Sequence, residues 1–477
     1  MRVSQYYRLG RTQPTLDFVD VDIRGDAKVF VDPRALRLWQ SAWAAECVAL
    51  IQNYFRTVLD SIHRRANNKA KALLRVLHEP NETHLGLSKG KARGRAIGYH
   101  SAVDVWEALT NSEAARSGLL EDLEDTILMV EGISSDIISD ITTNIIREPL
   151  IRYTQQMSEY YGIPLQEGVS SGPLWNSSSK QWEQRFERMP VTKHGKILLV
   201  PKGIVRIRMD YDVNEYYRHY LLPQLQEVEL SANSELVKLL KNGTQKVTKK
   251  DLKDKYGEGK SVIVRETKKY PGVLDKYRQD KRSTNRPPLD HVDLAASEGT
   301  PRPDWDALLM AISEVPSGRD DSREYENAIE SLLTALFYPS LTYPQVQYRI
   351  HNGRKRIDIT YTNMATEEYF RWLSLNYAAP NIFVECKNYS GDPGNPELDQ
   401  LSGRFSPSRG QVGILVCRNI DNKDLFLQRC KDTAQDHRGF IIALDDSDLS
   451  ELVGERKRFV TKSKYELLWQ RFRELIS

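Results

Sequence analysis

The chain has 477 residues, of which 40% are hydrophobic and 28% charged, values typical of a globular protein with two or three domains. No apolar run approaches the roughly 18 residues that a membrane span requires, and the N-terminus lacks the apolar stretch of a signal peptide, so no membrane association is expected. Four scattered cysteines without a Cys-x-x-Cys pair argue against a zinc site and a disulfide framework, and a cytoplasmic setting is expected.

The net charge of +3 conceals one strongly basic segment. Residues 237–286 contain 16 Lys and Arg against 6 Asp and Glu. A basic segment in an otherwise mildly acidic protein indicates a polyanionic partner near that segment. A solvated, lysine-rich helix and loop would have the same composition, so both interpretations stay open at this point.

Residues 1–282 are predicted to form a mixed α/β region that senses or binds a ligand or an activating partner. Residues 16–23 alternate apolar and acidic side chains and precede a second short strand, KVFVDP, which predicts a β-hairpin with Asp20 and Asp22 on its solvated face. Helical spacing of apolar residues follows at about 35–78 and 118–161. The residues of this region do not name its chemistry.

A linker is predicted at residues 283–304, where Pro, Ser, Thr, Gly and Asp are frequent and apolar periodicity is weak. It separates the N-terminal region from a domain at residues 305–477. In that domain we expect a helix from about Arg323, strands at 342–350, 356–362 and 381–389, a helix at 396–405, and strands at 411–419 and 440–446.

The third of these strands contains IFVECKNYS (382–390), which has the sequence of a buried strand but includes Glu385 and Lys387. A buried charge must be paired or bound to an ion. Residues i and i+2 of a strand share a face, so these two side chains point together, and Asp358 on a neighbouring strand can point to the same place. Two carboxylates form a hard oxygen site suited to Mg²⁺, with Mn²⁺ as a substitute, and the Cys386 carbonyl can add a ligand.

Such a site has the chemistry of phosphodiester hydrolysis. A metal there polarises the phosphoryl oxygen and lowers the pKa of a bound water, while Lys387 positions that water or stabilises the developing charge. Arg354, Lys355 and Arg356 lie beside the Asp358 strand, where phosphate contacts would hold a nucleic acid, although a solvated basic turn would look the same. The residues therefore predict a Mg²⁺-dependent nuclease.

The segments YENAIESLL, RKRIDIT, VECKN and PELDQLSGRF, over about residues 320–445, resemble the PD-(D/E)xK or restriction-endonuclease-like nuclease superfamily, and most closely its Mrr-like branch. The resemblance implies an αβββαβ core. It also implies a metal-site glutamate on the first helix, which Glu326 fits better than Glu330, and a glutamine near the substrate, which Gln400 fits. Ile357 stands where family members can have proline.

The resemblance further implies metal-dependent cleavage of DNA in bacterial restriction or anti-phage defence, and a homo-oligomer. Two alternatives stay open. The chain could be a sensor that binds nucleic acid without cleaving it, or an RNA-directed nuclease of the same fold.

Overall fold

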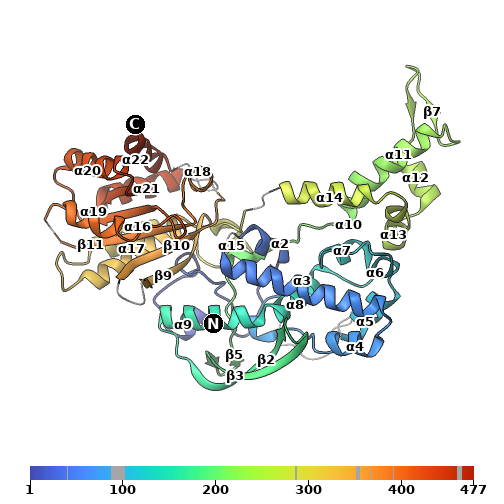
Figure 1. Ribbon diagram of the computed structural model, residues 1–477, viewed down its shortest axis with the longest axis horizontal. Coiled ribbons are helices and arrows are strands. Elements are labelled where there is room, and N and C mark those ends of the chain that lie inside the picture. The colour runs from blue at the N-terminus through green and yellow to red at the C-terminus, as the bar shows by residue number, and fades with distance from the viewer. Residues whose placement is uncertain are drawn as a thin grey trace.

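The computed structural model of the chain describes residues 1–39, 41–86, 102–284, 287–350, 355–366, 368–389, 391–458 and 465–477. The fold is mixed α/β, as predicted. Among the described residues, two clusters of buried apolar side chains divide the molecule, one running mainly from Val3 to Leu294 and the other from Ile312 to Leu475. Figure 1 shows the two corresponding halves beside each other, with a helical arm extending from the N-terminal half.

Helices dominate the N-terminal half. The buried face of its longest helix includes Cys47, Tyr54 and Val58, at the spacing that the sequence predicts. No helix in the described part of the chain is long and apolar enough to cross a membrane. The helices are α1 (Val3–Tyr6), α2 (Pro33–Leu38), α3 (Ala42–His63), α4 (Asn67–Leu74), α5 (Ala102–Asn111), α6 (Glu113–Ser117), α7 (Asp125–Met129), α8 (Ser135–Ile145) and α9 (Arg147–Tyr161).

The strands of the N-terminal half differ from the prediction. The longest, β2 (Gln166–Asn176) and β3 (Gln181–Met189), form an antiparallel ribbon, and the short β4 (Val191–Thr192) and β5 (Gly195–Lys196) follow. The hairpin predicted for residues 16–33 is wrong, because residues 16–23 form no strand and β1 (Phe30–Val31), which lies within the predicted second strand, pairs with β6 (Val205–Arg206).

The acidic residues of the predicted hairpin explain the error. Asp20 is buried and accepts hydrogen bonds from the Ser4 main-chain nitrogen at 2.9 Å and from the Ser4 hydroxyl at 2.6 Å. An acid that is satisfied by local donors can lie inside a protein. Alternation of apolar and acidic residues therefore did not mark a solvated face here.

The arm comprises residues 213–283 and contains most of the basic segment. Many of its cations are used within the protein, since Lys255 pairs with Glu229 at 2.5 Å and Lys281 pairs with Glu215 at 2.6 Å. Its elements are α10 (Val213–Tyr216), a π-helical turn (Tyr217–Leu221), α11 (Leu222–Ser231), the hairpin of β7 (Lys238–Leu239) and β8 (Gln245–Lys246), α12 (Lys249–Tyr256), α13 (Lys260–Lys269) and α14 (Gly272–Ser283).

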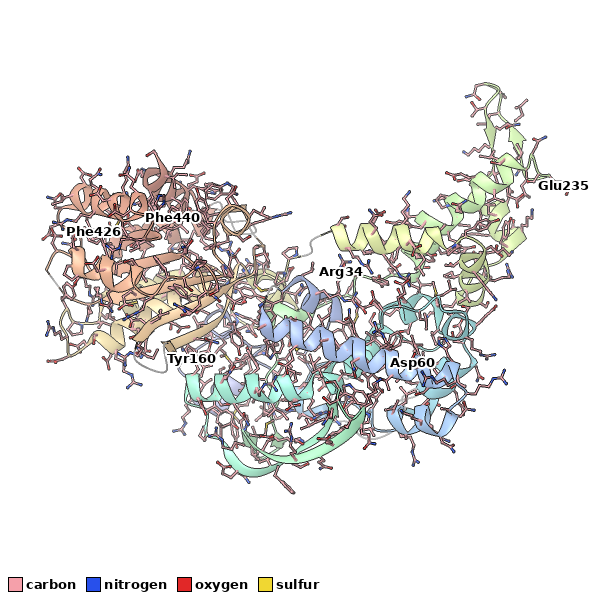
Figure 2. All side chains as sticks on the ribbon, viewed as in Figure 1. Arg34, Asp60, Tyr160, Glu235, Phe426 and Phe440 are labelled. Carbon is pink, nitrogen blue, oxygen red and sulfur yellow. The ribbon has the colours of Figure 1, made fainter. Side chains whose placement is uncertain are left out.

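Arg34 fixes both ends of the arm at its base, while Glu235 lies near the outer end (Figure 2). The Arg34 guanidinium forms an ion pair with Asp210 at 2.9 Å and donates to the Thr284 carbonyl at 2.8 Å. Because these two residues flank the arm in sequence, one buried arginine on α2 holds the entry and the exit of the arm together.

The predicted linker contains a helix, so it is not irregular throughout as expected. Asp290 caps α15 (His291–Glu298) by accepting from two main-chain N–H groups, and Leu294 is buried. The His291 Nε2 atom lies 2.8 Å from the Ala335 carbonyl oxygen of the C-terminal half. A helix this short is marginal alone and depends on its cap and on packing, which sequence periodicity does not record.

The C-terminal half contains the order of helices and strands predicted for residues 320–445, with two added helices, one between the second and third strands and one between the fourth and fifth. Its mixed sheet has the order β13-β12-β11-β10-β9, in which β9, β10 and β11 are antiparallel and β11, β12 and β13 are parallel. The elements are α16 (Trp305–Ser313), α17 (Ser322–Leu336), β9 (Leu341–Ile350), β10 (Lys355–Asn363), α18 (Glu368–Asn376), β11 (Asn381–Lys387), α19 (Asn395–Ser402), β12 (Val412–Cys417), α20 (Lys423–Gln435), β13 (Phe440–Asp445), α21 (Asp446–Arg458) and α22 (Glu466–Ile476).

Candidate active site

Two adjacent strands near the middle of the sheet bring two of the predicted carboxylates together. Ile359 of β10 pairs with Val384 of β11, so Asp358 and Glu385 stand one residue beyond that pair. The Cys386 main-chain N–H donates to Asp358 Oδ2 at 3.0 Å, which fixes the aspartate against β11. The sheet register thus places the two carboxylates on neighbouring strands.

Glu385, Lys387 and Gln400 form one hydrogen-bonded group. The Lys387 ammonium lies 3.2 Å from Glu385 Oε1 and 3.1 Å from Gln400 Oε1, and the Gln400 amide donates to the same Glu385 oxygen. Glu385 is only 1% exposed, and its Oε2 atom is buried with no hydrogen-bond partner in the described structure. The group therefore leaves one buried carboxylate oxygen unsatisfied.

Helix α17 contributes Glu326. The Gln347 amide of β9 donates to both carboxylate oxygens of Glu326, at 2.7 and 2.9 Å. Glu330, one turn later, instead forms a 2.5 Å ion pair with Arg11 of the N-terminal half and accepts from the Thr334 hydroxyl at 2.6 Å. Of the two glutamates considered from the sequence, the structure brings Glu326 into the site and directs Glu330 into the contact between the halves.

The carboxylates of the site disfavour one another's ionisation. Burial and then the charge of Asp358 raise the pKa of Glu326 to about 7 and that of Glu385 to about 7. Burial also raises the pKa of Asp358, although the Cys386 N–H and nearby cations oppose the effect. At neutral pH the site therefore retains protons that exposed carboxylates would have lost, and a bound cation would favour the ionised forms.

The donor chemistry fits a hard divalent cation, but the carboxylates do not form a finished ligand group. Among the described residues, no cluster of three or more His, Cys, Asp or Glu side chains could hold a metal ion in the arrangement present. Each carboxylate is held by a protein donor instead. The observations that favour a cation are the unsatisfied oxygen of Glu385 and the raised pKa values of Glu326 and Glu385.

Cys386 has a limited part in such a site. Burial, followed by the charge of Asp358, raises the pKa of its thiol well above the usual value. The thiol therefore stays protonated and is a poor metal ligand. The Cys386 carbonyl, which the sequence analysis names, stays the predicted ligand.

Arg404 and Gln347 belong to the site but were not identified from the sequence. The charge of Arg404 lowers the pKa of both Asp358 and Glu385, and its Nε atom is buried without a hydrogen-bond partner in the described structure. The available signal was its position just after the helix of Gln400, within PELDQLSGRF. Gln347 carried no comparable signal, since its side chain on strand β9 donates to Glu326 on helix α17, and no local sequence pattern indicates that contact.

Of the three basic residues predicted to contact nucleic acid, the structure describes two. Arg354 is outside the described residues, and Lys355 begins β10. Arg356 is exposed, and its charge lowers the pKa of Glu326 and of Asp358, so its guanidinium is close enough to influence the site. Contact of these residues with a nucleic acid stays a prediction.

The N-terminal half contacts both elements that hold Glu326. On α17, the ion pair of Glu330 with Arg11 is almost fully buried, with side-chain exposures of 1% and 16%. On β9, which supplies the glutamine that binds Glu326, the Tyr343 main-chain N–H donates to Asp17 Oδ1 at 2.8 Å. The position of Glu326 therefore depends on contacts from outside the C-terminal half.

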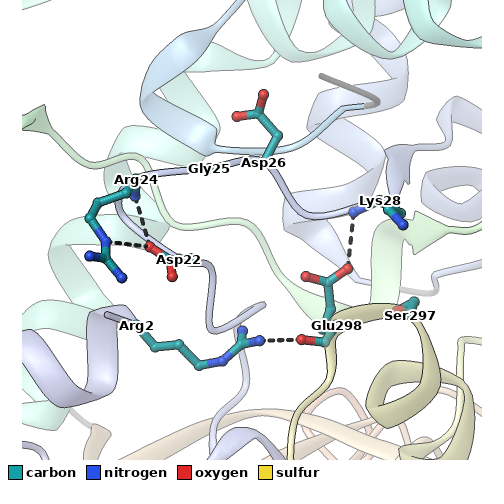
Figure 3. A pocket seen from close by; sticks show the side chains of 8 residues that line it. All are labelled: Arg2, Asp22, Arg24, Gly25, Asp26, Lys28, Ser297 and Glu298. Atoms are coloured by element: carbon teal, nitrogen blue, oxygen red, sulfur yellow. Dashed lines mark hydrogen bonds and ion pairs between the residues drawn. The ribbon is translucent and has the colours of Figure 1, made fainter. Parts of the chain in front are cut away.

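Apart from the candidate active site, a pocket of about 510 Å³ lies between the N-terminal loop and α15 (Figure 3). Two of its carboxylates accept hydrogen bonds from main-chain N–H groups. Asp22 binds the main-chain N–H of Arg24 at 2.9 Å, and Glu298 binds the main-chain N–H of Lys28 at 3.0 Å. The Glu298 contact attaches α15 to the N-terminal half, which is a structural role.

Residues 8–212 match a family model described as a domain of unknown function, DUF8370. The match covers less than half of the 477 residues and ends before the candidate site. No curated protein and no solved structure matches the chain. Arg11 and Asp17, which contact the C-terminal half, both lie within the matched region.

Proposed function

We propose that the C-terminal half is a metal-dependent nuclease of the PD-(D/E)xK type that hydrolyses phosphodiester bonds of DNA. The observation that carries the proposal is the meeting of Asp358, Glu385 and Lys387 on adjacent strands, with Glu326 and Gln400 supplied by the flanking helices. Like charges gathered at a buried position, with one carboxylate oxygen unsatisfied, are typical of a functional site.

Each residue has a role that its contacts support. Asp358, Glu385 and Glu326, with the Cys386 carbonyl, would hold Mg²⁺ or Mn²⁺. The metal, when bound, supplies Lewis-acid stabilisation of the phosphate and a water of lowered pKa. The Lys387 ammonium, oriented by Glu385 and Gln400, stabilises negative charge on the phosphate.

The surrounding cations suit an anionic substrate. Arg404 and Arg356 both favour the ionised carboxylates, and the Arg404 Nε–H, which has no hydrogen-bond partner in the described structure, would gain one from a phosphate oxygen. The biological setting extends the proposal by family resemblance alone: a cytoplasmic homo-oligomer that restricts foreign DNA and is switched by a ligand or partner of the N-terminal half. An RNA substrate is tested by the matched RNA in the same assay.

One observation favours the non-cleaving alternative. In the described part of the chain the acidic residues do not form a ready metal-binding group, because each carboxylate is held by a protein donor. A protein that only binds nucleic acid would retain DNA and show no metal-dependent cleavage under any condition.

The deciding experiment incubates the full-length protein with linear, circular and single-stranded DNA, and matched RNA, in Mg²⁺ or Mn²⁺. Lys387→Ala is expected to lower the cleavage rate at least about 100-fold, as the loss of one preorganised charge-stabilising group does. Lys457→Ala, which removes a half-exposed surface lysine paired with Asp306, is the matched control. If Lys387→Ala cleaves as fast as wild type, the site is assigned wrongly; if wild type binds but never cleaves, the sensor alternative holds.

A further inference from the structure

The hairpin of β7 and β8 stands at the outer end of the arm (Figure 1), and among the described strands it pairs with no other. Residues 238–246 are all exposed. Its turn is well formed, because the Leu240 N–H donates to the Thr244 carbonyl at 2.9 Å and the Gly243 N–H donates to the Leu240 carbonyl at 2.9 Å. A two-stranded hairpin alone is only marginally stable in water. Because its residues are exposed, packing against the rest of the protein does not explain why the chain forms a hairpin with this sequence here.

The charge of the hairpin is unbalanced. Residues 237–250 contain five lysines and no acidic residue. Lys238 and Lys246 are direct cross-strand neighbours, an arrangement in which like charges repel. Lys238 is offset by Asp251 at 2.8 Å, whereas Lys241, Lys246 and Lys250 have no acidic partner in the described part of the chain. A polyanion would relieve this repulsion.

Two leucines lie among these lysines at the tip. Leu239 is 73% exposed and Leu240 is 42% exposed. Lysine is depleted in protein–protein interfaces, so this mixture is a poor fit to a protein partner. Proteins that bind the minor groove of DNA combine basic side chains with apolar wedges that contact or enter base steps.

We propose that the hairpin is a contact surface for duplex DNA. Lys241, Lys246 and Lys250 bind backbone phosphates, and Leu239 and Leu240 pack against the sugar and base surface of the minor groove. In Figure 1 the hairpin and the C-terminal half, whose sheet carries the candidate active site, lie toward opposite ends of the molecule, so this is a second contact, remote from the chemistry. The inference goes beyond the proposed function because it requires DNA binding but not cleavage.

The test measures binding of the full-length protein to a fluorescein-labelled 30-base-pair duplex by anisotropy, in EDTA, over a series of salt concentrations. Lys241→Glu/Lys246→Glu is expected to weaken binding at least about tenfold. It is also expected to reduce the slope of log K against log salt by about two in magnitude, because each lost phosphate contact removes about 0.9 from that slope. The control, Lys69→Glu/Lys71→Glu, makes the same charge change at exposed positions of α4 and is expected to leave both values within twofold of wild type.

The leucines are tested separately from charge. Leu239→Ser/Leu240→Ser is expected to weaken binding about fivefold, the loss of about 1 kcal/mol of apolar contact, with an unchanged salt slope. The control is Leu375→Ser/Leu425→Ser, since these leucines are 74% and 46% exposed on the C-terminal half. Its affinity is expected to equal that of wild type.

Three results would overturn the inference. In the first, the wild type fails to bind the duplex. In the second, both hairpin variants bind the duplex as tightly as their controls. In the third, the leucine variant changes the sedimentation coefficient but not the DNA affinity, which would make the hairpin a self-association surface. The two proposals fail independently. Binding that needs the hairpin without any cleavage removes the nuclease alone, whereas cleavage with hairpin-independent binding removes the hairpin contact alone.

Discussion

The two halves of the molecule use buried charge in different ways. In the N-terminal half, the fully buried Asp125 binds Arg278 at 2.6 Å and also accepts from the main-chain N–H groups of Glu121 and Asp122 at 2.9 Å. In the C-terminal half, three carboxylates gather, and the pKa of each is raised. A compensated buried charge supports the fold, whereas an uncompensated one costs stability and marks a site that a ligand completes.

The largest expected effect separates activity from stability at Asp358. Asp358→Asn removes a proposed metal ligand, so the cleavage rate is expected to fall at least about 100-fold, equivalent to about 2.7 kcal/mol in the barrier. The melting temperature is not expected to fall, because the amide oxygen still accepts from Cys386 and one repelling charge is gone. Cleavage assays and thermal melts of the same preparation check both; a large drop in melting temperature would contradict the comparison.

The matching change in the N-terminal half is expected to do the reverse. Asp125→Asn leaves the Arg278 guanidinium, only 4% exposed, without its buried ionic partner. The free energy of unfolding is expected to fall by about 3 kcal/mol, the typical result of breaking a buried pair. Urea unfolding measures it. A loss below about 1 kcal/mol would mean that Asp125 is not the structural counterpart of Asp358.

The third prediction concerns pH and Mg²⁺. Since the pKa values of Glu326 and Glu385 are raised to about 7, the folded metal-free protein holds protons that the unfolded chain loses near pH 4.5. The free energy of unfolding attributable to these groups therefore falls as pH rises from about 4.5 to 7, and Glu385→Gln is expected to reduce that fall. Thermal melts across this range provide the measurement.

Mg²⁺ binding is expected to release protons in the same range, because a cation favours the ionised carboxylates. Calorimetric titrations at pH 6.5 in two buffers of different ionisation enthalpy report the number released, and pH 8.5 is the control, where little release is expected. Equal heats in both buffers at pH 6.5 would show that these carboxylates do not bind the metal.

The smallest expected effect tests the limit of the comparison. Burial, followed by the charges of Asp136, Glu79 and Asp26, raises the pKa of Asp140 in the N-terminal half to about 8. Asp140→Asn is expected to raise the melting temperature by a few degrees at pH 9 and by less at pH 6, where the folded acid holds a proton that the unfolded chain has lost, and to leave it unchanged near pH 3.5. An unchanged value at pH 9 would show that nearby cations offset this acid too.

The sequence could predict those parts of the C-terminal site that depend on residues close together in the chain, and not those that depend on contacts between distant elements. Glu385 and Lys387 share a strand face by two-residue alternation, and Asp358 has the same local context on a neighbouring strand, so a pattern within short segments was sufficient. Gln347 and Arg404 act across element boundaries, and no local pattern encodes which helix a strand side chain will meet. The choice of Glu326 over Glu330 came from family resemblance, and the ion pair with Arg11 explains it physically.

The N-terminal half was less predictable because its buried polar groups are satisfied individually. Asp20 looked solvated by alternation but binds Ser4. The helix at residues 291–298 lacks apolar periodicity but is stabilised by the Asp290 cap and by contacts with both halves. Tertiary partners of this kind leave no periodic trace in the sequence.

The contacts of Arg11 with Glu330 and of Asp17 with Tyr343 have a thermodynamic consequence for the whole chain. A ligand that binds the N-terminal half and strengthens or weakens these two contacts also changes the free energy that holds Glu326 in its position in the site. Binding free energies are reciprocal, so the proposed Mg²⁺ or DNA, when bound at the C-terminal site, would change the affinity of such an N-terminal ligand by the same factor. A ligand of the DUF8370-like region can therefore be sought by its dependence on Mg²⁺, before its chemistry is known.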